Sequence, residues 1–162
     1  MAATVKQVNY ALVLLESAGY DTSQMSSKYK ALGAMMQECS GSVEDWLRGL
    51  DHSRISAIID QLKWGPAAAS NAQLGLPPLT GRPEMIGPAE GFRAALQPDL
   101  AKLRTRLGYA VPANAFGVAQ REALRRIDTE TDAEWFMSRK YPNGSAISLV
   151  CLVADEIMGL NQ

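Results

Sequence analysis

The sequence predicts an all-α protein with a compact N-terminal four-helix module, a Pro/Gly-rich arm and a second helical bundle. Apolar residues recur every three or four positions through most of the chain, as they do on one face of a helix. Polar capping residues and glycines mark the ends of these stretches, and prolines gather in one central stretch. The predicted boundaries are 1–64 for the module, 65–88 for the arm and 89–162 for the C-terminal helical region.

The first two helices are predicted within the first forty residues. Thr4 and Gln7 form a capping-box pattern, and the apolar stripe that follows ends at Gly19. A second helix opens at Asp21 and ends before Gly41. Its apolar residues are spaced by four and three positions, which predicts one buried face; they are Met25, Tyr29, Leu32, Met36 and Cys39.

Two more helices complete the predicted module. Ser42 caps a short third helix, and Asp51 caps a fourth that the Gly-Pro pair at 65–66 stops. The spacing of Trp46 from its apolar neighbours directs it into the interior, and Trp64 at the helix end is predicted to cover the open mouth of a small core. Both tryptophans are therefore interpreted as packing residues.

Residues 65–88 differ in composition from the rest of the chain. They hold five of the eight prolines and four glycines, with almost no charge. This composition predicts a linker or an extended arm instead of a regular helix. Five large apolar residues favour an arm that packs on something over a solvated tether; they are Leu74, Leu76, Leu79, Met85 and Ile86.

Helical patterns resume after Pro88. An apolar stripe runs to Gly108, with Pro98 either kinking the helix or starting a new one. Asn114 is predicted to cap the next helix, which extends through Ile127.

The last thirty residues contain two further elements. Thr131 and Glu134 form a capping-box pattern, and "PNG" at 142–144 predicts a turn. The closing segment fits either a buried helix capped by Ser145 or a strand of about nine residues. The helix is favoured because its spacing holds across the whole segment.

Bulk composition limits the classes of function. Of 162 residues, 47% are hydrophobic and 20% charged, which is typical of a folded globular protein. The net charge of −1 disfavours nucleic-acid binding over the whole surface, so such binding would need a local basic patch. The N-terminal residues lack a signal-peptide pattern, and no stretch is long and apolar enough for a bilayer. Cys39 and Cys151 offer neither a disulfide framework nor metal-ligand spacing, so a cytoplasmic protein is predicted.

Five groups of residues in the first module occur in a recognisable order: Gln7, Gly19-Tyr20, Ser40-Gly41, Trp46-Leu47, and Ile58-Ile59-x-x-Leu62-Lys63-Trp64. In these positions residues 4–64 resemble the C-terminal module of the GemA-type regulatory proteins of Mu-like phages, and related phage and plasmid modules. The resemblance implies a mobile-element protein of a bacterial host cell that modulates a DNA-associated process without catalysis. Residues 65–162 carry no such resemblance.

The third and fourth predicted helices also have the spacing of a helix-turn-helix, in which residues 52–64 would enter a major groove. The exposed positions of this second helix offer few donors, and one of them is acidic; they are His52, Ser53, Arg54, Ser56, Asp60, Gln61 and Lys63. An ordinary helical hairpin is the favoured interpretation.

Catalytic and metal sites find little support. The alternate acidic residues from Asp128 to Glu134 are spaced like a calcium loop, but Ala133 and Arg139 stand where that loop needs glycine and glutamate. His52 is the only histidine, and no nucleophile lies near it in the sequence. We therefore predict a protein that is not an enzyme, with no cofactor and no metal.

Basic residues supply the candidate binding positions. Pairs four apart share a helix face, and adjacent helices would join them into a ridge for phosphates or an acidic partner; the candidates are Lys28, Lys30, Lys102, Arg106, Arg121 and Arg125. The first functional hypothesis is a binding protein that modulates a DNA-associated process. The alternative is a protein–protein interaction module, such as a host-defence inhibitor or a virion assembly component, for which a homo-oligomer is also compatible.

Overall fold

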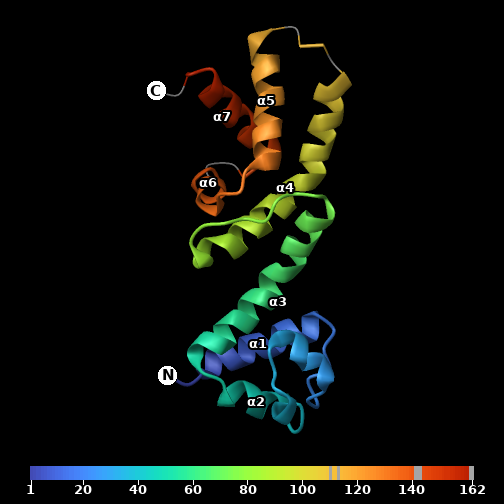
Figure 1. Ribbon diagram of the computed structural model, residues 1–162, viewed down its shortest axis with the longest axis vertical. Coiled ribbons are helices and arrows are strands. Elements are labelled where there is room, and N and C mark those ends of the chain that lie inside the picture. Colours follow the sequence, from blue (N-terminus) through green and yellow to red (C-terminus); the bar gives the residue numbers. More distant parts are fainter. Residues whose placement is uncertain (110, 113, 141–143, 161–162) are drawn as a thin grey trace. The chain divides into compact units, whose positions relative to one another are not determined.

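Helices dominate the computed structural model, which describes residues 1–109, 111–112, 114–140 and 144–160 (Figure 1). In these ranges no strand forms, and isolated β-bridges join Ala2 to Asp51 and Thr80 to Asp132. The all-α prediction is confirmed. The chain divides into two compact units, Met1–Pro66 and Ala67–Gln162, which we describe separately.

The first unit contains α1 (Val5–Ser17), two short 3-10 helices η1 (Ser27–Leu32) and η2 (Met36–Glu38), α2 (Val43–Gly49) and the first part of α3 (His52–Gln73). Both hydrogen bonds of the predicted capping box at Thr4 and Gln7 are present. Trp46 is buried as expected, and its ring packs edge-on against Tyr29, with 5.6 Å between the ring centroids.

The predicted second helix is wrong in its form. Residues 21–40 contain η1 and η2 in place of one continuous α-helix, because Gly33 adopts a left-handed conformation with φ of 85° that ends η1. Met25, Tyr29 and Leu32 of the predicted stripe are buried, but Met36 is exposed. Three of the five predicted residues are therefore buried, and Cys39 is partly buried against the same core.

The end of the fourth predicted helix is also wrong. α3 continues past the Gly-Pro pair at 65–66 to Gln73, so the residues that were expected to begin an arm are helical. Pro66 is exposed, and it removes only one backbone hydrogen bond. Asn71 at the far end is buried and donates to the main-chain carbonyl of Glu90, 3.0 Å away. Trp64 thus lies within the helix and is half-buried, with the Lys63 ammonium 4.5 Å from its ring centroid.

Residues 83–88, at the end of the predicted arm, are also helical and form the start of α4 (Pro83–Tyr109). Pro83 occupies the first position of that helix, where a missing N–H costs nothing. Only residues 74–82 are non-helical, and we call this segment the strap. Leu79 of the strap is buried, and Thr80 exchanges main-chain hydrogen bonds with Thr131 and Ala133 at 2.7 and 2.9 Å. An ordered arm was the favoured alternative, and these nine residues match it.

The second unit contains residues 67–73 of α3, which we call the α3 tail, the strap, α4, α5 (Ala115–Thr129), α6 (Ala133–Ser138) and α7 (Ala146–Ile157). α4 passes through both Pro88 and Pro98 and ends at Tyr109, one residue beyond the predicted stop. The helix bends along its length (Figure 1). Of the two alternatives for Pro98, the structure shows a proline inside a continuous helix, as at a kink.

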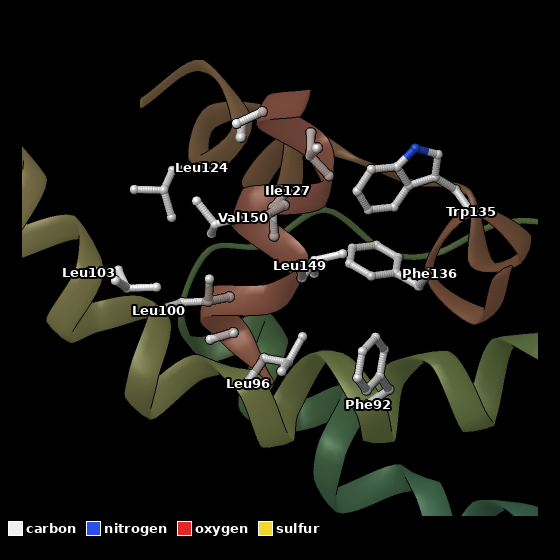
Figure 2. Packing of buried hydrophobic residues seen from close by; sticks show 14 of the residues in the cluster. Phe92, Leu96, Leu100, Leu103, Leu124, Ile127, Trp135, Phe136, Leu149 and Val150 are labelled. Carbon is white, nitrogen blue, oxygen red and sulfur yellow. The ribbon is translucent and has the colours of Figure 1, made fainter. Parts of the chain in front are cut away.

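The core of the second unit forms where α4 meets α5, α6 and α7. Phe92, Leu96, Leu100 and Leu103 line one side of α4 and point toward residues of the other three helices (Figure 2). Phe136 and Leu149 are at most 2% exposed and lie at the centre of this cluster. The rings of Trp135 and Phe136 meet edge-on, with 5.1 Å between their centroids.

Local capping sequences were mostly predictive in this unit. Asn114 caps α5, and Ser145 caps α7, which confirms the favoured helical interpretation of the last segment. The capping box at Thr131 is wrong by one residue, because Asp132 caps α6 and accepts from the backbone N–H of Glu134. Pro142 and Asn143 of the predicted turn lie outside the described residues. Within the described part of the chain, no helix is long and apolar enough to cross a membrane.

Candidate functional site

The basic residues predicted to bind are distributed over both units. Lys28 and Lys30 are exposed on η1 of the first unit. Arg54 and Gln61, two of the seven exposed residues of the helix-turn-helix hypothesis, form hydrogen bonds within the first unit. Arg54 donates to Glu38 at 3.2 Å and to the carbonyl of Gly33 at 3.2 Å, and Gln61 donates to the carbonyl of Ala31 at 3.1 Å. A groove-reading role would require these two side chains to leave their partners.

His52 is likewise engaged within the first unit, with Gln7 of α1. Its Nδ1 lies 3.0 Å from Nε2 of Gln7, which also donates to Ser56 at 3.1 Å. Among the described residues, no group of three or more His, Cys, Asp or Glu side chains is placed to hold a metal ion.

In the second unit, α4 and α5 pack against each other and carry the remaining basic candidates. Nε of Arg121 donates to the carbonyl of Leu107 at 2.7 Å, which ties α5 to α4. Lys102 forms an ion pair with Asp99 at 2.8 Å, and Arg125 forms one with Glu122 at 2.8 Å. Arg106 is exposed near the end of α4. The helices are adjacent, as a ridge would need, but acidic neighbours offset two of the four charges.

An open groove of about 990 Å³ lies elsewhere on the second unit. It is bounded by the end of α3, the start of the strap, the middle of α4 and the end of α5. Most of its lining is apolar or small, and the residues are Ser70, Leu74, Gly75, Leu76, Pro77, Ala94, Gln97, Pro98, Ala101, Arg104, Asp128 and Thr129. Its volume falls at the upper end of the range typical of ligand sites.

The groove follows one stripe of α4. Glu90, Arg93, Gln97, Ala101 and Arg104 are separated by steps of three and four residues, so they share a helix face beside the apolar core stripe. The N-terminal half of this face is covered, since Glu90 and Arg93 are at most 6% exposed. The C-terminal half forms the groove floor. We call this stripe the second face of α4.

Under the cover lies a layer of buried polar residues. Nδ2 of Asn71 donates to a carboxylate oxygen of Glu90 at 2.6 Å, and Nη1 of Arg93 donates to the Pro77 carbonyl at 2.6 Å. Arg93 is 1% exposed, and its Nε and Nη2 have no hydrogen-bond partner among the described residues. Burial lowers the pKa of the Arg93 guanidinium, while the charges of Glu90 and Asp128 act in the opposite direction.

Arg104 holds the polar side of the groove. Its Nε and Nη2 bind the two carboxylate oxygens of Asp128 at 3.0 and 2.5 Å, and Nη2 also donates to Gln97 at 3.0 Å. Gln97 in turn donates to the carbonyl of Arg93 at 3.3 Å. About a third of each ionic side chain is exposed. The pair thus presents a fixed guanidinium to the groove with no net charge.

Sequence reasoning did not find this groove. Its lining comes from three segments that are distant along the chain, and one of them, residues 70–77, was assigned to an arm. The available signal was the recurrence of polar residues at 90, 93, 97 and 104 beside the apolar stripe of α4. A second polar stripe on a helix is usually solvated, so only the packing of the strap reveals it as a buried layer.

The fold and the groove thus define an all-α protein with an open, largely apolar groove on its second unit. Comparison with protein-family models, curated proteins and solved structures finds no match to the chain. The resemblance of residues 4–64 to GemA-type regulatory proteins therefore stays a prediction.

Proposed function

We propose that the protein acts by binding another protein, without catalysis, and that the groove of the second unit receives part of that partner. The supporting observation is an open apolar surface beside a core that is already complete. Leu74 on the rim is 58% exposed, while the core stripe of α4 is fully covered by α5, α6 and α7. Open apolar surfaces with a few fixed polar groups are typical of interaction sites.

Binding of Nile red, an uncharged dye that fluoresces in apolar surroundings, tests whether the groove accepts a ligand. Ala101 lines the groove and Ala95 lies on the exposed surface of the same helix. We expect the dye to bind the native protein, Ala101→Phe to abolish binding, and the matched control Ala95→Phe to retain it. Absence of binding to the native protein, or equal binding by both variants, would contradict the proposal.

A second candidate function is the modulation of a DNA-associated process through direct nucleic-acid contact. It is supported by the resemblance of the first unit and by the packing of α4 on α5, which carry four basic candidates. Two facts weigh on the other side. Residues 67–162 contain ten basic and ten acidic residues, and Asp99 and Glu122 neutralise Lys102 and Arg125.

A gel shift at several salt concentrations tests this second candidate. Phosphate contacts make nucleic-acid affinity fall steeply with salt. We would reverse the charge of Lys102, Arg106 and Arg125 but retain Arg121, since its bond to the Leu107 carbonyl supports the fold. A salt-dependent shift that the triple reversal removes would support direct contact, and no shift at low salt would exclude it.

A further inference from the structure

The second face of α4 already has one occupant, and this occupant indicates what the open half accepts. The strap covers the N-terminal half with an extended segment, Leu76-Pro77-Pro78-Leu79, which carries no charge. Leu79 is buried, and the Pro77 carbonyl accepts a hydrogen bond from Arg93 at 2.6 Å. On this face the strap is therefore held through a main-chain carbonyl that accepts from a guanidinium, while Leu79 packs into the neighbouring core of the second unit.

The open half repeats this chemistry. Ala94, Pro98 and Ala101 provide a low apolar floor, and Arg104 stands at its edge. Nη1 of Arg104 takes no part in the bonds to Asp128 and Gln97, so it has donors left for a ligand. Because Asp128 neutralises Arg104, a charged ligand gains no net attraction and loses its hydration.

We propose that the groove binds an extended, uncharged apolar segment of a partner protein, with a main-chain carbonyl of that segment accepting from Nη1 of Arg104. This inference rests on the proposed function. An extended segment is required because a helix uses its carbonyls internally, except in its last turn. Arg104 is held in place by Asp128 and Gln97 before binding, so little side-chain freedom is lost.

Fluorescence anisotropy with the full chain tests the inference. The probe is a labelled peptide with capped ends and the strap sequence of residues 74–80, LGLPPLT. We expect saturable binding that Ala101→Phe weakens at least tenfold and Ala95→Phe changes less than twofold. Arg104→Lys keeps the charge opposite Asp128 but loses the planar donor group, and should weaken peptide binding at least threefold.

Two further results decide between explanations. A peptide with its three leucines replaced by aspartate should not bind, and equal binding would overturn the inference. Peptide binding that survives Ala101→Phe would show that the probe displaces the strap, which also overturns it. If Nile red binds the native protein and the peptide does not, the groove remains a binding site and only the peptide inference fails. If neither binds, the proposed function fails with it.

Discussion

The buried guanidinium of Arg93 permits a direct test of the polar layer through replacement by methionine. Its Nε and Nη2 lack partners among the described residues, and each unsatisfied buried group costs about 1–3 kcal/mol. The substitution removes these groups and retains much of the side-chain length. It also removes the bond to Pro77 and the contact with the Phe136 ring, 5.5 Å from its centroid, which together stabilise by about 1–3 kcal/mol. We therefore expect the free energy of unfolding of this variant to lie between about 1 kcal/mol below and about 2 kcal/mol above that of the native protein.

Urea unfolding followed by circular dichroism measures this change. The matched control is Arg104→Met, in which the same replacement leaves Asp128 half-buried without its partner; we expect it to lose about 1–2 kcal/mol. The dependence of the free energy on urea should stay the same in both variants. A loss of 3 kcal/mol or more in Arg93→Met would refute the reasoning, since it would show that the buried guanidinium is well satisfied and stabilises the fold.

Three further predictions concern stability. Phe136→Ala should lower the free energy of unfolding by about 3–5 kcal/mol, measured in urea, because its ring is fully buried in the core of the second unit. Hydrogen bonds from the Met35 backbone N–H and from Arg54 hold the pKa of Glu38 below its ordinary value, so its stabilisation is present above the unfolded-state pKa and is lost as the pH falls through the folded-state pKa. Glu38→Gln should therefore make stability less dependent on pH in the acid range, and an unchanged acid profile would contradict this. Pro66→Ala should raise the free energy of unfolding by about 1–3 kcal/mol, because it restores the N–H that reaches the Leu62 carbonyl within α3; no effect would indicate that the helix ends before it.

Local signals were sufficient where the structure depends on neighbouring residues. Thr4, Ser42, Asn114 and Ser145 were all predicted as helix caps, and each accepts a hydrogen bond from a backbone N–H two or three residues into its helix. A cap and the group it satisfies lie within one turn, so the sequence contains both. The apolar stripe of α4 was predicted for a related reason, since its period directly reflects the buried face.

The prolines were wrongly interpreted as helix ends. The hydrogen bond that a proline removes is visible in the local sequence, whereas the tertiary packing that compensates for its loss is not. Pro66, Pro88 and Pro98 all lie inside helices. Each removes one hydrogen bond, but the helices continue because the residues beyond them are packed, as Asn71 is against Glu90 and Leu100 is in the core. No local pattern reports these contacts. Local pattern was also insufficient for residues 21–40, because the helical spacing of the apolar residues gives no sign of the left-handed turn at Gly33.

The candidate site shows the same division. Basic pairs four residues apart were expected to share a helix face, and the helices that carry them, α4 and α5, pack against each other. Their ion pairs with Asp99 and Glu122 were open to prediction from i,i+3 spacing, and they reduce the field of the ridge. The groove needed the tertiary structure, because the strap and the end of α5 reach it from distant parts of the sequence.

The polar layer under the strap explains why the groove has a defined edge. The main-chain hydrogen bonds of Thr80 hold the end of the strap, and the Pro77 carbonyl, which accepts from Nη1 of Arg93 at 2.6 Å, holds its start against α4. Buried polar groups that fix one register at some cost in stability are known in other helical proteins. In Arg93→Met we therefore expect the free energy of unfolding to be retained. We expect Nile red to bind at least threefold more weakly, because Leu76 and Pro77 no longer hold one position. Unchanged dye binding in this variant would mean that the main-chain hydrogen bonds of Thr80 and the burial of Leu79 set the position of the strap without Arg93.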